Sequence, residues 1–210
     1  MARTVPVRLM NLAGRADALA ELEVGFLDQL LPLFQVSDGT PRADLEVVRV
    51  NSVPRFIEYL FFGGVDLIHL SSHGTTNSIQ IGEDSFSVTA LRRALKENDP
   101  IDAVIVNTSC QMASQRWVRA FLDAGALAYI ATKRSVWAKD AAIFSAAFYS
   151  AYFGTIHVKR TPLQRAYDSY RLAHAAYASF VPGASRSRFY FATDGKTPGP
   201  KLLPKIAVKQ

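Results

Sequence analysis

Short runs of strand-forming residues alternate along this chain with longer segments whose apolar residues recur at helical spacing. Two of these runs cover residues 65–72 and 103–109, and each reads as a strand buried within a sheet. Strands and helices that alternate in this way require a mostly parallel sheet with helices on both faces. The sequence therefore predicts an α/β fold, a three-layer α/β/α sandwich around a mostly parallel sheet of about six strands.

The expected elements cover most of the chain up to residue 192. Strands are expected at 5–12, 45–50, 65–72, 103–109, 127–132 and 189–192, with a short hairpin at 78–86. Helices are expected at 16–34, 52–62, 89–97, 113–124, 139–153 and 161–179. Ser52 is expected to cap the second helix. The apolar stripe of the first helix is expected to run through Leu19, Leu22, Phe26, Leu30 and Phe34.

Size and composition limit what the chain can do. At 210 residues with 49% apolar content, it suits one domain over residues 1–194, followed by a basic, proline-containing tail over 195–210. No apolar run approaches the roughly 20 residues needed to cross a bilayer, and the first residues lack the apolar stretch of a secretion signal. A single cysteine excludes an internal disulfide, so a cytoplasmic location is expected.

The net charge of +6 is concentrated near the carboxyl terminus. Residues 181–210 hold six basic residues and one acidic residue, which leaves a charge of only +1 on the preceding 180 residues. A near-neutral body is a poor match to a phosphate-binding face, so nucleic acid is not favoured as a partner. The alternative, in which the tail contacts nucleic acid or an acidic partner, stays open. No glycine-rich nucleotide-binding motif follows an expected strand.

The clearest chemistry lies at the ends of two of the expected buried strands. The only cysteine, Cys110, follows the run 103–109, and His73-Gly74 follows the run 65–72. Because active sites in open parallel sheets collect at the carboxyl ends of the strands, we expect the thiol and the imidazole to lie close together. An imidazole can accept the thiol proton, and the thiolate is the nucleophile. The pair predicts a cysteine peptidase in which Cys110 attacks and His73 transfers protons.

Gly74 and the other histidines have separate interpretations. Because glycine has no β-carbon, its backbone N–H can face an oxyanion at close range, with the N–H of Cys110 as a second donor. His69 is expected to be a core residue in mid-strand, and His157 and His174 are expected to pack or to lie on the surface. No two histidines have the spacing of zinc ligands, so no metal site is predicted. A lone cysteine after a strand is more often an inert buried thiol, so the prediction depends on the pairing.

The residues around both strand ends resemble those of the caspase-like cysteine peptidases of clan CD, in particular the bacterial CHAT-type domain, a relative of separase. The resemblance covers about residues 65–153 and rests on 67–74, 104–110, 117–126, 129–132, Val136, Asp140 and the helix with Phe144 and Phe148. It implies a caspase-like sandwich and an endopeptidase that needs no cofactor. It also assigns the catalytic dyad to His73 and Cys110, and the oxyanion hole to the N–H groups of Gly74 and Cys110.

The substrate pocket is where the resemblance leaves alternatives open. Gln111-Met112 follow the cysteine, where the CHAT group commonly has an acidic and a small residue. The segment 133–140 keeps only the second of the family's two acids, Asp140, which either pairs with a basic substrate residue or serves as a helix N-terminal charge. Lys133 and Arg134 would instead select an acidic residue. The residue preference at the cleavage site therefore stays open.

Regulation and the rival function follow from the same resemblance. Caspases are activated by cutting a linker, whereas here only residues 123–127 separate the helix after Cys110 from the next strand. A single-chain enzyme is therefore expected, gated by a regulatory protein partner or a ligand. Its expected partner is a polypeptide substrate, without membrane association. The alternative function is a catalytically inactive, caspase-like binding or signalling module.

Overall fold

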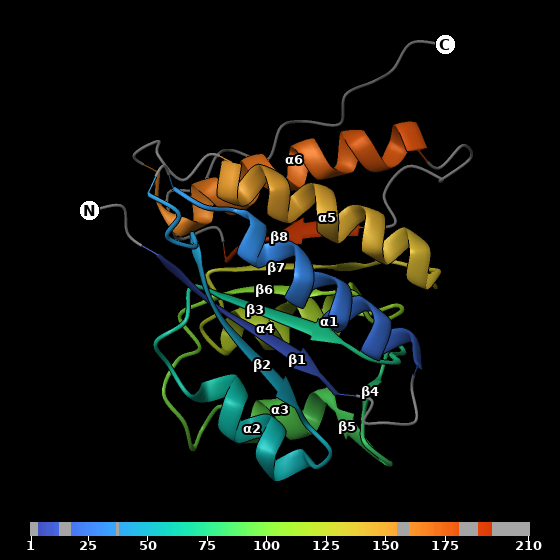
Figure 1. Cartoon of the computed structure of the whole chain (residues 1–210). Helices are drawn as coiled ribbons and strands as arrows, with labels where there is room; N and C mark the ends of the chain where they lie inside the picture. Colours follow the sequence, from blue (N-terminus) through green and yellow to red (C-terminus); the bar gives the residue numbers. More distant parts are fainter. Residues whose placement is uncertain (1–3, 13–17, 37, 155–159, 181–188, 195–210) are drawn as a thin grey trace.

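The computed structural model describes residues 4–12, 18–36, 38–154, 160–180 and 189–194. Within these residues a six-stranded sheet lies between two layers of helices (Figure 1). The predicted basic tail at 195–210 and His157 lie outside the described residues, so the predictions made for them stay predictions.

The central sheet has the strand order β2-β1-β3-β6-β7-β8. Among the described strands, the first five in this order run parallel, and only β8 at the edge is antiparallel to its neighbour β7. Strands β3, β6 and β7 are buried along their whole length, which explains their largely apolar sequences. The predicted α/β sandwich with a mostly parallel six-stranded sheet is confirmed. The strands are β1 Val5–Asn11, β2 Ala43–Arg49, β3 Leu67–Ser71, β6 Val104–Asn107, β7 Ala128–Thr132 and β8 Phe189–Ala192.

Helices cover both faces of the sheet, in layers that lie above and below it in Figure 1. One layer holds α1 (Ala18–Leu30), α5 (Ala138–Gly154) and α6 (Pro162–Phe180). The other layer holds α2 (Val53–Phe61), α3 (Val88–Ala94) and α4 (Gln115–Asp123). Each layer packs apolar residues against one face of the sheet, so the core has two halves separated by the strands. Because α5 packs along both α1 and α6, apolar residues surround much of its circumference.

The first helix buries a different face from the one expected. Leu22 and Phe26, which belong to the expected stripe, are 67% and 40% exposed. Helix α1 ends at Leu30 and continues as a 3₁₀ turn, Leu31–Leu33. Both faces of the helix carry apolar residues, so their spacing alone does not decide which one meets the sheet. Among the residues of this helix and turn whose burial is described, the buried ones are Ala20, Glu23, Val24, Leu27 and Leu31.

The strands that lead to the candidate residues end earlier than expected. β3 ends at Ser71 and β6 ends at Asn107, so His73 and Cys110 lie in loops beyond the strands. The expected cap of α2 is also only partly right. Ser52 occupies the N-cap position with an extended backbone, but its side chain makes no capping hydrogen bond.

A two-stranded hairpin lies near the carboxyl ends of the parallel strands (Figure 1). It consists of β4 (Ser78–Ile81) and β5 (Asp84–Ser87), which pair antiparallel and confirm the expected hairpin. Gly74 pairs with Ile79 through an isolated bridge. The indole Nε1 of Trp117 in α4 donates to the Thr75 carbonyl oxygen at 3.2 Å. The loop after β3 is therefore held by both the hairpin and α4.

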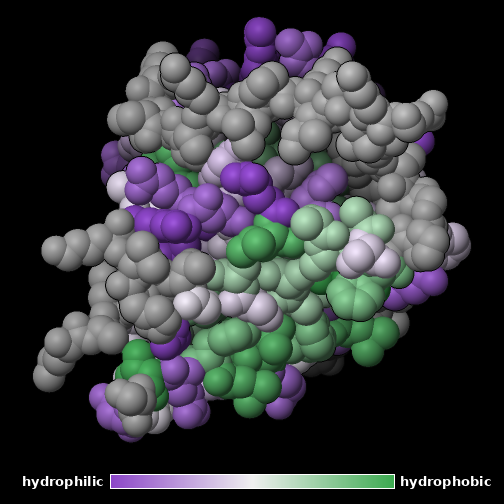
Figure 2. Space-filling view, turned by 90° about the horizontal axis from the view of Figure 1, so that it is seen from above, coloured by the Kyte–Doolittle hydropathy of each residue, from purple (hydrophilic) through white to green (hydrophobic). Residues whose placement is uncertain are grey.

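The surface on the side of α6 divides into a polar part and an apolar part (Figure 2). Large apolar side chains that stay exposed in this helix layer include Leu22 and Phe26 of α1, and Leu172 and Phe180 of α6. Core packing within the chain thus leaves apolar surface on these helices. No helix of the described residues is long and apolar enough to span a membrane.

Candidate active site

His73 and Cys110 leave the sheet from neighbouring strands. β3 and β6 pair in parallel, with Leu70 opposite Asn107. The Thr108 N–H donates to the Leu70 carbonyl oxygen at 3.1 Å, which continues the pairing past the end of β6. The loops after these strands therefore start side by side at the carboxyl edge, where ligand sites of open parallel sheets occur.

The two loops touch at Gly74. A β-carbon built on Gly74 would lie 2.6 Å from the Cys110 carbonyl oxygen and 2.9 Å from the Cγ atom of Met112. No larger residue fits there without displacing the backbone, so glycine permits the His73 loop to lie directly against the Cys110 turn. Gln80 of β4 holds the same loop, its N–H donating to the His73 carbonyl oxygen at 2.9 Å.

The turn that carries Cys110 is held by the segment after β7. Gln111 has a left-handed backbone with a φ of 60°, which costs a non-glycine residue about 1–2 kcal/mol. Its N–H donates to the Arg134 carbonyl oxygen at 3.4 Å. The Cys110 Sγ atom accepts from the Val136 N–H at 3.4 Å, and the thiol is half-buried. The thiol also lies 3.8 Å from the Val136 carbonyl oxygen, and its partial exposure is a feature of reactive rather than inert cysteines.

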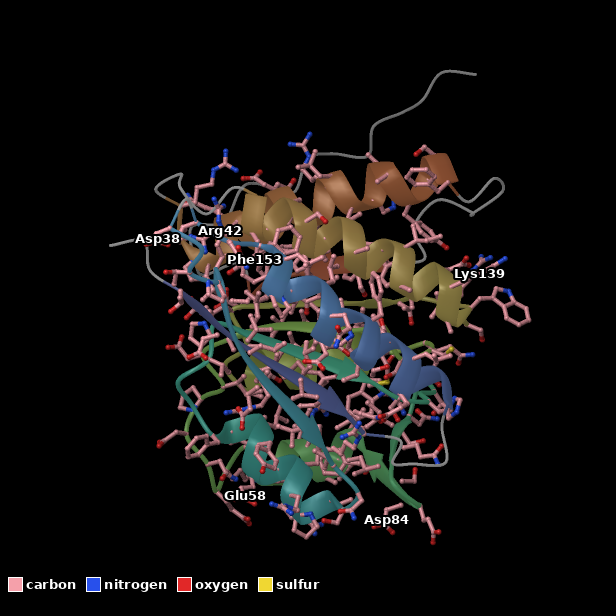
Figure 3. All side chains as sticks on the ribbon, in the orientation of Figure 1. Asp38, Arg42, Glu58, Asp84, Lys139 and Phe153 are labelled. Atoms are coloured by element: carbon pink, nitrogen blue, oxygen red, sulfur yellow. The ribbon has the colours of Figure 1, made fainter. Side chains whose placement is uncertain are left out.

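His73 and Cys110 line one cavity of about 260 Å³. The other lining residues come from α1, from the ends of β3 and β6, and from the start of α5. In Figure 3, the start of α5, marked by Lys139, lies on the side of the molecule toward which the β3 arrow points. His73 is exposed, whereas the lining residue Glu23 is 6% exposed. The cavity therefore leads from the surface at His73 inward to a buried carboxylate.

Glu23 of α1 is the centre of a buried hydrogen-bond network. Its Oε2 atom accepts from Ser71 Oγ at 2.6 Å and from Thr108 Oγ1 at 2.7 Å. Its Oε1 atom accepts from Ser145 Oγ of α5 at 3.1 Å. Burial raises the pKa of Glu23, but the adjacent His69 ring and the hydroxyl donors outweigh burial and hold the pKa below its ordinary value. Glu23 is therefore a carboxylate at neutral pH.

His69 lies in the core, as predicted, and contacts Glu23. Its Nε2 atom lies 3.4 Å from Glu23 Oε1, which is longer than a well-formed hydrogen bond, so this is an electrostatic contact. Its Nδ1 atom lies 3.0 Å from the Tyr149 hydroxyl. Burial, and next the Glu23 charge, raise the pKa of Tyr149 well above its ordinary value, so its hydroxyl keeps a proton to donate. The His69 ring thus lies between Glu23 of α1 and Tyr149 of α5.

The Gly74 and Cys110 N–H groups are those expected to form an oxyanion hole. Neither the Gly74 N–H nor the Cys110 N–H donates to a backbone acceptor among the described residues. The isolated bridge beside Gly74 uses the N–H groups of Thr75 and Gln80 instead. A ligand oxygen could therefore take both donors, although this assignment stays a prediction.

The three residues predicted for the substrate pocket lie elsewhere. Among the described residues, the cavity lining contains none of Asp140, Lys133 and Arg134. Asp140 is 2% exposed, in the first turn of α5, and accepts from the Tyr177 hydroxyl of α6 at 3.4 Å. The Lys133 ammonium lies 4.6 Å from the centre of the Tyr190 ring. Their assignment to the substrate pocket stays a prediction.

Sequence reasoning missed Glu23 and its hydroxyl partners. The available signal was an acidic residue on the same helical face as Ala20, Val24 and Leu27, a position at which a charge is almost never buried without partners. Those partners come from the strand ends and from α5, so only the fold brings them together. His174, expected to pack or to lie on the surface, is half-buried in α6, where burial lowers its pKa.

This chain is similar to known proteins in its three-dimensional structure rather than in its sequence. No protein-family model and no curated protein matches the sequence. A secreted C11 cysteine protease from Bacteroides thetaiotaomicron, in complex with an irreversible peptide inhibitor, matches with a TM-score of 0.55 at 13% identity, over 91% of this chain and 66% of that one. The arginine-specific cysteine proteinase gingipain R matches with a TM-score of 0.53 at 11% identity, over 85% of this chain and 43% of that one.

Separase also matches in fold. In the Saccharomyces cerevisiae separase–securin complex, the TM-score is 0.50 at 14% identity, over 92% of this chain and 12% of that one. The chain thus spans less than two-thirds of each of these proteins. At such identities the likeness shows the fold alone, which this chain shares with these cysteine proteases. The closer resemblance to CHAT-type domains and the cytoplasmic location stay predictions.

Proposed function

We propose that this protein is a caspase-like cysteine endopeptidase, with Cys110 as the nucleophile and His73 as the general acid and base. The observation that supports the proposal most strongly is that both residues, delivered by neighbouring strands, line the same cavity. The likeness in fold to cysteine proteases favours the same conclusion. The partner of this site is then a polypeptide substrate.

The first half of the proposed reaction forms an acyl-enzyme. The Cys110 sulfur bonds to the carbonyl carbon of the scissile peptide, while His73 accepts the thiol proton. The carbonyl oxygen becomes an oxyanion, to which the N–H groups of Gly74 and Cys110 donate. The C–N bond then breaks, and His73 returns the proton to the departing amine. The products of this half are a free amine and a thioester on Cys110.

The second half hydrolyses the thioester. A water molecule loses a proton to His73 and bonds to the thioester carbon, which forms a second oxyanion at the same donors. The C–S bond breaks, His73 returns the proton to the sulfur, and a carboxylic acid leaves. Because protons pass only between His73, the thiol, the departing amine and water, the mechanism requires no cofactor.

The proposed enzyme works as one uncut chain. α4 ends at Asp123 and β7 begins at Ala128, and Gly125 within this turn has a φ of 83°. A β-carbon on Gly125 would lie 2.6 Å from the Pro100 β-carbon, so this connection is tight and packed. A connection of this kind offers no linker for activation by cleavage, and control by a protein partner or a ligand remains the proposed alternative.

Hydrolysis of a peptide mixture by the purified protein tests the proposal. Wild-type protein and the Cys110→Ala variant are incubated with peptides of diverse sequence, and new termini are identified by mass spectrometry. We expect internal cuts with wild type and none with Cys110→Ala, whose folding is checked by thermal unfolding. Equal cutting by both proteins would refute the role of Cys110. No cutting by wild type would instead favour the inactive binding module.

A further inference from the structure

We propose that Tyr129 and Asn107 are positioning residues, which hold the Cys110 thiol in place for the reaction proposed above. Tyr129 lies in β7, Asn107 is the last residue of β6, and both side chains are fully buried. Neither of these described residues lines the cavity, so they act on the site only through the turn that carries Cys110. The effect on rate rests on the proposed function, whereas the effect on the turn does not.

Buried hydrogen bonds connect the two residues to the turn in a chain with one direction. The Ser109 N–H donates to Asn107 Oδ1 at 3.0 Å, which fixes the orientation of the amide because a backbone N–H can only donate. The Asn107 Nδ2 atom then donates to the Tyr129 hydroxyl oxygen at 3.2 Å, and Tyr129 donates its own proton to the Met112 carbonyl oxygen at 3.2 Å. Burial, only partly offset by the Asn107 hydrogen bond, raises the pKa of Tyr129 well above its ordinary value, so the hydroxyl keeps that proton. One buried pair therefore holds a residue on each side of Cys110.

The turn needs such support because its backbone is strained. Gln111, directly after Cys110, has a φ of 60°, and a non-glycine residue keeps this conformation only where the surrounding structure holds it. The Gln111 N–H itself donates at the long distance of 3.4 Å. The shorter hydrogen bonds lie on either side, at Ser109 and Met112, and Thr132 Oγ1 adds one more by donating to the Ser109 carbonyl oxygen at 2.5 Å. The conformation at Cys110 therefore depends on its buried neighbours.

Met112 extends the effect to the loop that carries His73. Met112 is fully buried, and a β-carbon built on Gly74 would lie 2.9 Å from its Cγ atom and 3.0 Å from its Sδ atom. A shift of Met112 would therefore be transmitted to Gly74, which directly follows His73, as well as to Cys110. Loss of the Tyr129 hydroxyl group is thus expected to change the distance between the thiol and the imidazole.

Two tyrosine-to-phenylalanine variants test the inference against a matched control. Tyr129→Phe removes a single oxygen and keeps the ring, which stacks on Phe121 with the ring centres 4.5 Å apart. Tyr170→Phe is the control, because the Tyr170 hydroxyl also donates to a backbone carbonyl oxygen, that of Phe189, at 3.1 Å, on the other face of the sheet. We expect both variants to unfold about 2–6 °C below wild type. Stability alone therefore does not distinguish them.

The separate kinetic constants distinguish positioning from a general loss of structure. Hydrolysis of a peptide that wild type cleaves is measured at a temperature at which all three proteins are folded. We expect Tyr129→Phe to lower kcat about 10- to 100-fold while KM stays within about twofold of wild type. Tyr170→Phe should leave both constants within about twofold. If kcat of Tyr129→Phe stayed within about twofold of wild type, or if only KM changed, the inference would be overturned and the peptidase would still stand.

A second substitution tests whether Asn107 and Tyr129 act as one chain. Asn107→Ala should lower kcat by a factor similar to that of Tyr129→Phe. Because both changes break the same chain, the double variant should lie no more than about threefold below the slower single variant. Losses that multiply would contradict a shared role. Should Asn107→Ala not fold, Tyr129→Phe and Tyr170→Phe still decide the matter.

Amide hydrogen exchange examines the turn without requiring catalysis. Exchange of residues 108–113 is followed by mass spectrometry in wild type and in both phenylalanine variants. We expect it to be about tenfold faster in Tyr129→Phe than in wild type or Tyr170→Phe. Unchanged exchange in Tyr129→Phe would overturn the inference whatever the rates of hydrolysis. Faster exchange in Tyr129→Phe, together with a wild type that cleaves no peptide, would refute the proposed function and leave the positioning of Cys110 standing.

Discussion

Gly74 approaches Cys110 so closely that a β-carbon at position 74 would lie 2.6 Å from the Cys110 carbonyl oxygen. This approach joins the loop after β3 to the turn after β6, and each loop carries one member of the proposed dyad. The position of the imidazole relative to the thiol therefore depends on a residue that has no side chain.

Gly74→Ala is expected to slow peptide hydrolysis by about 100-fold while the protein still folds. The added methyl group must displace the backbone of one loop, and a displacement of about 1 Å at reacting groups can lower a rate by about 100-fold. The expected loss of unfolding free energy is about 1–3 kcal/mol. Denaturant unfolding and hydrolysis rates measure the two effects.

Gly25→Ala is the matched control for the Gly74 substitution. Gly25 lies within α1, where an added β-carbon would meet no atom within 4 Å. Because alanine favours a helix over glycine, this variant should be more stable by about 0.4–1 kcal/mol and keep full activity. If Gly74→Ala were as active as Gly25→Ala, the close approach would have no role in catalysis.

Arg8 is expected to contribute strongly to stability through α2. The residue is 1% exposed, and its Nη1 atom donates to the Tyr59 and Phe62 carbonyl oxygens at 2.6 and 2.7 Å. Its Nε atom donates to Glu46 at 2.6 Å. Arg8→Met removes these donors from the end of the helix, and we expect a loss of about 2–4 kcal/mol in chemical denaturation. Arg55→Met, at an exposed arginine, should stay within about 0.5 kcal/mol of wild type.

The ionisation of Glu23 predicts how stability depends on pH. Because the pKa of Glu23 in the folded protein lies below its unfolded value, the ionised carboxylate stabilises the fold. That contribution is fully present above the unfolded pKa of about 4.3 and is lost as the pH falls through the folded pKa. Wild type should therefore lose more stability than Glu23→Gln between pH 5 and the acid limit of folding. Parallel stability curves for the two proteins over that range would contradict the assignment.

The strands could be predicted because a strand buried on both faces has a largely apolar sequence. β3, β6 and β7 are covered on both faces, so they stand out as short apolar runs. The placement of His73 and Cys110 at one edge then followed from the parallel arrangement. The exact strand ends did not follow, because the residues just past them, Ser72, Thr108 and Ser109, are small polar residues that occur in strands and loops alike, and Thr108 still pairs with Leu70.

The deeper part of the candidate site could not be read from the sequence. Both faces of α1 are apolar, and the larger side chains Leu22 and Phe26 lie on the exposed one. The buried face carries Glu23, whose burial depends on hydroxyl donors from other elements. A stripe of large apolar residues therefore predicted the wrong face, and with it the acid at the end of the cavity was missed.

The rate at which a peptidyl acyloxymethyl ketone labels Cys110, followed by intact-protein mass spectrometry, tests the proposed dyad most directly. Iodoacetamide labelling corrects for simple exposure of the thiol. The account predicts that wild type reacts with the peptidyl probe about 100-fold faster than His73→Gln does, because the imidazole generates the thiolate and assists the reaction. Equal labelling rates for wild type and His73→Gln would contradict it.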